Sequence, residues 1–279
     1  MRILKTDSFA SGYAAVLNTI LADPDFVCSP RGQKCLEVQN LGLEILDPLN
    51  NFFFNKIRDT EKLKRYLAAE LYWYFSGRRD LEFISKYSKF WNTLSKNGLI
   101  NSAYGYLIFE ERNDKAWGEY EWAYNSLVND KDTRQAIIRF NKPNMSYSGN
   151  VDFPCTLNAI FQIRENKLYL TIFMRSQDEW FGRIYDFPFF SCLLQQMRLH
   201  LLEKYPELKL GSITHINSSS HIYEKNVEKI KEMIKEGIKE DKIPEMKKSI
   251  ISSSGKFLKK EFEEDKEDDF FNWIKLYIN

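Results

Sequence analysis

Apolar side chains recur every three or four positions over residues 61–75, and this spacing predicts a helix. Thr60 stands where an N-terminal cap is expected, and Ser76-Gly77 is a suitable end. Glu70 falls on the apolar face, which is unusual for a carboxylate. The other members of that face are Leu63, Tyr66, Leu67, Leu71 and Tyr74.

Two segments with the alternation of β-strands surround Glu165-Asn166 and predict a hairpin. In residues 157–165, apolar side chains alternate with Asn158 and Gln162, and residues 167–176 repeat this pattern of alternation. The run RQAIIRF at 134–140 predicts a further strand.

The C-terminal half begins with a long apolar segment and ends in a charged one. Residues 187–205 are rich in apolar side chains and predict a buried helix. Residues 224–248 are rich in Lys and Glu with Ile at helical spacing, and residues 257–269 mix both charges. These two stretches predict one or two solvated amphipathic helices. No repeat and no clear linker interrupts the chain, so we expect a single domain over residues 1–279.

Composition narrows the class of protein. The chain has 279 residues, 43% of them hydrophobic, and 40 basic residues balance 39 acidic ones to a net charge of +1. This balance argues against binding to nucleic acid or to a membrane through bulk charge. No apolar stretch has the ~20 residues of a spanning helix, and no signal peptide is recognisable. The four cysteines show no CxxC pair, so we expect no metal site and a reducing cytoplasm.

Cys155, in the segment DFPCT, is a candidate nucleophile. Cys155 and Arg175 come from the outer ends of the predicted hairpin, and a guanidinium close to a thiol lowers the thiol pKa. Arg175 and Ser176 could also bind a phosphate. The alternatives are that Cys155 is a small buried hydrophobe and Arg175 a surface arginine.

Two carboxylates and one polar pair are further candidates. Asp186 precedes Phe187-Pro188, so it could act as a helix cap. Glu70 could be the partner of a buried polar group or, with a raised pKa, a proton relay through water. His221 and Tyr223 lie two positions apart and would share one face of a strand.

Six motifs in order resemble those of the thymidylate synthases, covering roughly residues 31–230. The segments DFPCT, RSQDEWFG and HIY resemble the cysteine, RSxDxxxG and HxY motifs of that family. Upstream, AAELYWYFSG resembles the helix with the cofactor-side glutamate, FWNTLSKNGLINSAYG the tryptophan-to-YG segment, and DTRQAII the DSRR strand. Residues 231–279 form a divergent, charged region, and the family's short C-terminal segment that closes over folate has no recognisable counterpart in FNWIKLYIN. The resemblance implies one α/β domain of the α+β type, with a large twisted mixed sheet, helices on one face and a homodimer on the other.

Departures from the family pattern indicate a cytosine-handling branch. Asp186 stands where thymidylate synthases carry Asn, and Thr156 stands where His usually follows the cysteine. Both changes resemble the bacteriophage deoxycytidylate hydroxymethylases. Gln135 replaces the second phosphate-binding arginine, and Pro30 falls at the N-terminal one, for which Arg31 or Lys34 could substitute.

The resemblance implies a folate-dependent transfer of a one-carbon unit to pyrimidine C5. Cys155 thiolate would attack C6, and 5,10-methylenetetrahydrofolate would supply the one-carbon unit as co-substrate, without a metal. Asp186 would face the base and select cytosine, because a carboxyl can accept from the amino group and, when protonated, donate to N3. Tyr104 would belong to the network that removes the C5 proton.

The resemblance also implies which residues bind the nucleotide and the folate. The phosphate would be held by Arg175, Ser176 and, across the dimer, Arg134, and the sugar by His221 and Tyr223. The folate site would contain Asp178, Gly182, Trp91 and Glu70, and Glu70 would organise water there.

Four hypotheses about the activity stay open. We favour hydroxymethylation of dCMP, in which water quenches the exocyclic methylene, in the cytoplasm or in a host cytoplasm if the gene is viral. The alternatives are methylation of dUMP or dCMP by hydride transfer from the folate, hydroxymethylation of CMP, and a catalytically inactive nucleotide-binding protein.

Overall fold

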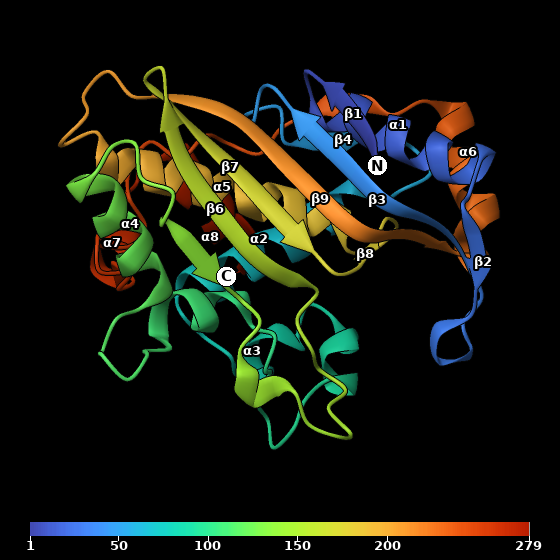
Figure 1. The fold of residues 1–279 in the computed structure, drawn as a ribbon, viewed down its shortest axis with the longest axis horizontal. Coiled ribbons are helices and arrows are strands. Elements are labelled where there is room, and N and C mark those ends of the chain that lie inside the picture. The colour runs from blue at the N-terminus through green and yellow to red at the C-terminus, as the bar shows by residue number, and fades with distance from the viewer. Residues whose placement is uncertain (279) are drawn as a thin grey trace.

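A computed structural model describes residues 1–278, and its central feature is one twisted, eight-stranded mixed sheet (Figure 1). Strand β9 lies in the middle, parallel to β7 and antiparallel to β3. The path across the sheet is β1 (Arg2–Thr6), β3 (Cys35–Ile45), β9 (Lys209–Tyr223), β7 (Lys167–Met174), β6 (Thr156–Arg164) and β5 (Ile137–Arg139), with β2 (Phe26–Cys28) on β3 and β8 (Gln177–Asp178) on β9. The expected large mixed sheet is confirmed.

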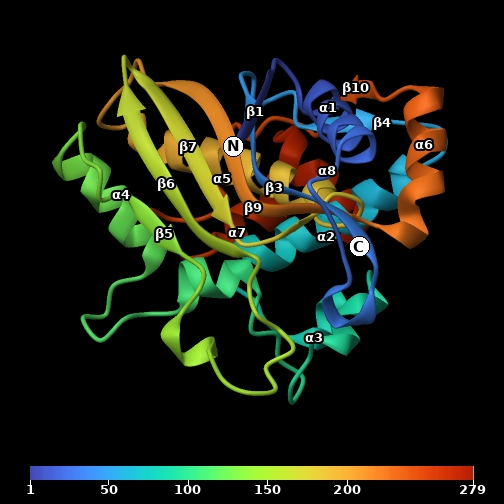
Figure 2. The same ribbon diagram turned by 45° about the vertical axis from the view of Figure 1, so that its right-hand side comes forward.

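The long helices cover one face of this sheet, and the opposite face carries no helix in Figures 1 and 2. The layer contains α1 (Phe9–Ala22), α2 (Thr60–Phe75), α5 (Arg183–Leu201) and α8 (Asp269–Ile278). Phe9 of α1 stacks on Phe187 of α5 at 4.7 Å between ring centroids, so aromatic packing joins helices within the layer. The remaining elements are the helices α3 (Leu81–Ile84), α4 (Glu119–Asn129), α6 (Val227–Glu236) and α7 (Lys259–Glu264), and a small sheet of β4 (Phe52–Phe54) with β10 (Lys239–Asp241).

Helix α2 confirms the predicted helix, but its cap differs. Asp59, rather than Thr60, is the N-cap, and its carboxylate accepts a hydrogen bond from the Lys62 backbone N–H at 3.0 Å. An ionised carboxylate at a helix start also interacts favourably with the helix dipole, which a threonine hydroxyl does not. Thr60 is the first helical residue.

The hairpin of β6 and β7 forms about the expected turn. Glu165 and Asn166 both adopt left-handed backbone conformations, with φ of 48° and 56°, as a two-residue turn between right-twisted strands requires. The third predicted strand is shorter than its sequence pattern, because only Ile137–Arg139 pairs with β6. The backbone of residues 134–136 lies outside the strand.

Helix α5 begins four residues before the expected start, at Arg183, and ends at Leu201. Gly182 is its N-cap, so Asp186 is the fourth helical residue and the capping interpretation of Asp186 is wrong. Pro188 is the sixth helical residue, so it lies inside the helix and cannot donate the backbone hydrogen bond that the Ile184 carbonyl would otherwise accept.

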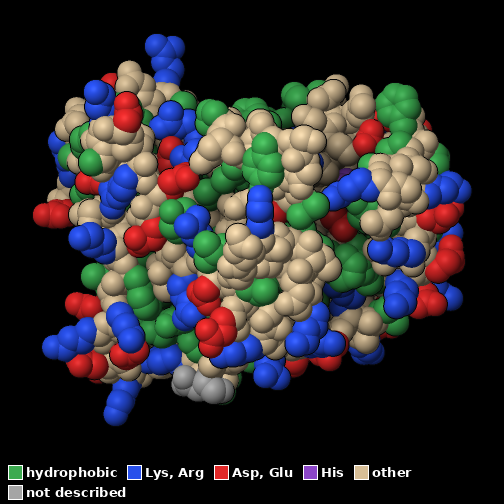
Figure 3. All heavy atoms as spheres, turned by 90° about the horizontal axis from the view of Figure 1, so that it is seen from below, with side chains coloured by type: hydrophobic (Ala, Val, Ile, Leu, Met, Phe, Trp, Pro, Cys, Tyr) green, Lys and Arg blue, Asp and Glu red, His purple; other side chains and the backbone are tan. Residues whose placement is uncertain are grey.

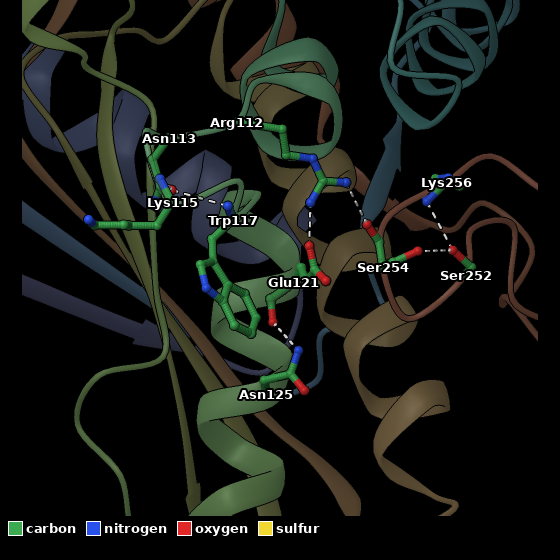
Figure 4. A network of polar contacts seen from close by, with 9 residues as sticks. All are labelled: Arg112, Asn113, Lys115, Trp117, Glu121, Asn125, Ser252, Ser254 and Lys256. Atoms are coloured by element: carbon green, nitrogen blue, oxygen red, sulfur yellow. Dashed lines mark hydrogen bonds and ion pairs between the residues drawn. The ribbon is translucent and has the colours of Figure 1, made fainter.

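The amphipathic helix predicted in residues 224–248 is confirmed as α6, with Ile230 and Met233 buried, but the C-terminal region as a whole is more buried than its charge pattern predicts. Apolar side chains from it are fully or almost fully buried: Ile243, Met246, Ile250, Ile251, Phe262, Phe270, Phe271 and Ile274. The backbone of this region also forms a hydrogen bond with the rest of the domain. Arg112, which pairs with Glu121 of α4, donates to the Ser254 carbonyl at 3.3 Å (Figure 4). In this region charged residues alternate with buried apolar ones, and the buried apolar side chains determine where the segment packs.

Surface charge is mixed over the face shown in Figure 3, where basic and acidic side chains are interspersed. Within residues 1–278, none of the helices combines the length and the apolar character needed to cross a bilayer.

Candidate active site

The strand ends of the β6–β7 hairpin place Cys155 beside Arg175. The Arg175 backbone N–H donates to the Cys155 carbonyl at 2.9 Å, so the two residues are directly opposite each other. The guanidinium reaches across the Cys155 segment and donates to the carbonyls of Pro154 at 3.0 Å and Phe153 at 2.8 Å. Arg175 is therefore fixed in place, and part of its guanidinium remains exposed.

The pKa of the Cys155 thiol depends on burial as well as on the neighbouring charges. Desolvation raises the pKa of the thiol above its ordinary value, and the charge of Arg175 acts in the opposite direction without overcoming burial. Arg31 assists Arg175, whereas Asp186 opposes thiolate formation. Arg175 therefore acts on the thiol pKa in the expected direction, but the net pKa in the free protein is raised because burial outweighs that charge.

Asp186 projects from the first turn of α5 towards the same space. Its Oδ2 accepts from the Gln177 amide nitrogen at 2.9 Å, and no backbone N–H within the described residues donates to its side chain. Burial raises the pKa of Asp186 to about 6 and the Gln177 hydrogen bond partly offsets that effect. Near neutral pH this carboxyl can thus exist in either protonation state.

Glu70 lies at the centre of an aromatic hydrogen-bond network on the helix layer. Its Oε1 accepts from Tyr66 at 2.7 Å and Tyr74 at 3.4 Å, and Trp91 donates to Tyr66 at 2.8 Å. Burial raises the pKa of Glu70 to about 8, and the charge of Asp186 contributes in the same direction. The structure thus brings Trp91 and Glu70 together through Tyr66, and both hypotheses about Glu70 fit this environment.

Tyr104 reaches the site through Thr156. The Thr156 hydroxyl donates to the Tyr104 hydroxyl at 2.8 Å, and the Tyr104 ring stacks on Tyr74 at 5.4 Å. Burial raises the Tyr104 pKa well above its ordinary value, and the charges of Asp186 and Cys155 add to this effect. Tyr104 therefore remains a neutral hydroxyl next to the Cys155 segment.

Strands β8 and β9 hold the remaining polar residues. Asp178 pairs with His221 in the sheet, and the His221 and Tyr223 rings are 5.1 Å apart, on one face of β9 as expected. Asp178 Oδ1 accepts the backbone N–H groups of Trp180 and Phe181, which folds the loop that ends at Gly182. Ser176, between Arg175 and this loop, is half-buried.

The basic candidates differ in position. Arg31 acts electrostatically on both Cys155 and Tyr223, whereas Lys34 forms an exposed ion pair with Glu224 at 2.6 Å. Of the two substitutes for the N-terminal arginine, Arg31 therefore faces the site. Arg134 does not: it is exposed and precedes β5, near the opposite end of β6 from Cys155, roughly 25 Å of extended strand away.

Gln177 is a residue that the sequence motifs do not single out. It occupies the variable position of the RSxDxxxG segment, and only the fold reveals that its amide meets Asp186. No group of three or more metal-ligating side chains occurs within residues 1–278.

A half-buried thiol beside an arginine, with a carboxyl close enough to act on it electrostatically, is an arrangement suited to nucleophilic chemistry. Comparison with known proteins agrees. The sequence model of thymidylate synthase matches residues 49–270, and the chain belongs to the thymidylate synthase family. Members of this family transfer a one-carbon unit from methylenetetrahydrofolate to a pyrimidine nucleotide.

Three relatives illustrate the range of the similarity. A deoxyuridylate hydroxymethyltransferase of Bacillus phage SP01 is 29% identical over 76% of this chain, and the chain spans 56% of that protein. A deoxycytidylate 5-hydroxymethyltransferase of Enterobacteria phage T4 is 28% identical over 75% of this chain and 84% of its own length. A thymidylate synthase of Clostridium beijerinckii is 24% identical over 78% of this chain and 79% of its own length.

Proposed function

We propose that this enzyme hydroxymethylates C5 of a cytosine nucleotide, dCMP, with methylenetetrahydrofolate and water as the other substrates. The observation that carries the proposal is Asp186, a carboxyl with a pKa raised to about 6 that lies close to Cys155. In this position the side chain meets the edge of a pyrimidine whose C6 is at the thiol.

The pairing groups of cytosine explain why a carboxyl suits this base. Cytosine presents an acceptor at N3 and a donor at N4, whereas uracil presents a donor at N3 and an acceptor at O4. A protonated Asp186 donates to N3 through one oxygen and accepts from the amino group through the other. Each unpaired polar group in a buried site costs ~1–3 kcal/mol, which is enough to determine base preference.

Cys155 supplies the covalent step. Its thiolate adds to C6, and the electron pair of the C5–C6 bond makes C5 the nucleophile that attacks the one-carbon unit. As the adduct forms, Asp186 transfers its proton to N3 and so neutralises the charge that develops on the ring. Loss of the C5 proton and of the tetrahydrofolate amine leaves an exocyclic methylene, to which hydroxide from water adds. Return of the N3 proton to Asp186 and expulsion of Cys155 as the thiolate restore the cytosine ring.

The folate would bind beside Glu70, Trp91, Asp178 and Gly182. These residues fit a flat, heteroaromatic ligand, because the carboxyl of Glu70 is set among aromatic side chains and Gly182 adds no side chain to the loop. When bound, methylenetetrahydrofolate supplies the carbon at the formaldehyde oxidation level. Glu70, with a pKa near 8, can hold or release a proton through water at its free edge.

The nucleotide phosphate would meet Arg175, Ser176 and Arg31, and the sugar would meet His221 and Tyr223. Arg134 is too far from Cys155 in the same chain, so it can take part only from a second subunit. The uncovered face of the sheet is the surface on which we propose that two copies pair (Figure 2).

The similarity to a deoxyuridylate hydroxymethyltransferase favours one alternative, the same chemistry on dUMP. Methylation by hydride transfer is the other, because thymidylate synthases are also similar to this chain. Mass analysis of the products from dCMP, CMP and dUMP, each with methylenetetrahydrofolate, distinguishes them. We expect hydroxymethyl-dCMP and tetrahydrofolate. A methyl product with dihydrofolate, or turnover of dUMP alone, would contradict the proposal.

A mixing experiment tests the shared site. Cys155→Ser and Arg134→Ala should each be inactive alone, whereas a hybrid dimer contains one site with both lesions and one with neither. Random exchange makes half of the dimers hybrid, so we expect about a quarter of the wild-type activity in an equal mixture. Mixtures that exchange subunits, as shown by mass spectrometry, and still lack activity would exclude the role of Arg134.

A further inference from the structure

We propose that Gln177 is a positioning residue that fixes which oxygen of Asp186 accepts and which carries the proton, and thereby sets the preference for cytosine. This inference rests on the proposed function, in which Asp186 faces the base. Gln177 itself touches neither the nucleotide nor the folate in this scheme, and it acts through Asp186.

The contact is a buried one. Gln177 begins β8, its backbone pairs with Ser220 of the central strand β9, and the residue is 1% exposed. Its amide nitrogen donates to Asp186 Oδ2 at 2.9 Å. The donor is therefore held by the sheet, through β8, and the acceptor is held by helix α5.

Gly182 makes room for this contact. A Cβ at position 182 would lie 2.6 Å from the Gln177 amide nitrogen and 3.4 Å from Asp186 Oδ2. Any side chain there would displace Gln177 from Asp186. The glycine thus serves the hydrogen bond as well as the start of the helix.

The chemistry of the amide gives the contact its direction. An NH₂ group can only donate, so the oxygen that it meets must offer a lone pair and cannot present a proton to it. A proton on Asp186 is therefore placed on Oδ1, which is free to donate to N3 of cytosine. Oδ2 retains a second lone pair for the amino group at C4.

The neighbouring charges do not substitute for Gln177. Arg183 and Glu179 pair with each other in full burial, so their effects on Asp186 oppose one another. The other titratable groups that face Asp186 carry no positive charge: Asp178, Glu70, Tyr74, Tyr104 and Cys155. Gln177 is the one hydrogen-bond donor to this carboxyl within the described residues.

The test uses two variants of the full-length enzyme, Gln177→Met and Gln177→Glu. ¹³C NMR of the Asp186 carboxyl, assigned by its loss in Asp186→Asn, follows its titration without any substrate. Both substitutions remove the hydrogen bond that stabilises the Asp186 carboxylate, so the midpoint of its titration should move to higher pH. We expect the proton affinity of Asp186 to rise about tenfold in Gln177→Met, and by more in Gln177→Glu, which places an acceptor there. At pH 5, where Asp186 is protonated in each protein, the ratio of kcat/KM for dCMP to that for dUMP should fall about tenfold.

Gln195→Met is the matched control. Gln195 is also buried on α5 and hydrogen-bonded, but to Ser191 and Met246. It should change neither the titration nor the ratio. An unmoved midpoint in both Gln177 variants, or a moved midpoint with an unchanged ratio, would overturn the inference. Turnover of dUMP alone by the wild-type enzyme would instead refute the proposed function, and the titration would still measure the contact.

Discussion

Cys155→Ser should abolish turnover, with a loss of about a thousandfold or more in kcat. The reason is ionisation: a serine hydroxyl is far less acidic than a thiol and gives almost no alkoxide to add to C6. Burial raises the pKa even of the native thiol, so a weaker acid in the same environment would be still less ionised. Binding of the nucleotide should survive, because Arg175, Ser176 and His221 are unchanged.

The measurement pairs steady-state kinetics with equilibrium binding of dCMP. Cys192→Ala is the control, since Cys192 is fully buried in α5 and takes no part in the proposed site. That variant should lose stability through a small cavity but retain turnover. Near-normal activity of Cys155→Ser would remove Cys155 from the mechanism.

The sheet and the helix layer are predictable from the amino-acid sequence because their signals are local. The alternation in 157–165 and 167–176 specifies which side of each strand is buried, and Glu165-Asn166 specifies the turn. Helix α2 follows from its spacing, and the position of Glu70 on the apolar face of that helix already marks it as an unusual carboxylate.

The residues around Asp186 are less predictable, because their roles depend on contacts between distant elements. Asp before Phe-Pro is a typical capping pattern, yet the loop held by Asp178 starts the helix four residues earlier. The contact of Gln177 with Asp186 depends on β8 lying beside β9, which no spacing in the sequence reveals. The C-terminal region illustrates the same limit: a charge pattern shows which residues can face water, but not whether the apolar ones find a partner.

Asp186→Asn should reverse the base preference of the enzyme. The carboxyl of Asp186 makes no capping hydrogen bond, so the substitution tests the chemistry of the site rather than the helix. An amide can donate to N3 of cytosine but cannot transfer a proton to it, so the step in which charge develops loses its acid. Activity on dCMP should fall by one to several orders of magnitude, at ~1.4 kcal/mol for each factor of ten.

The same substitution should make dUMP a relatively better substrate. The new amide can accept from N3–H and donate to O4, where charge builds in the uracil reaction, and it removes a carboxylate that would repel that oxygen. Measurement of kcat/KM for dCMP and dUMP in the wild-type enzyme and in Asp186→Asn tests this expected change in base preference. If Asp186 were only a buried acid away from the base, the ratio of the two values would stay where it is in the wild-type enzyme, and the preference for a cytosine nucleotide would need another origin.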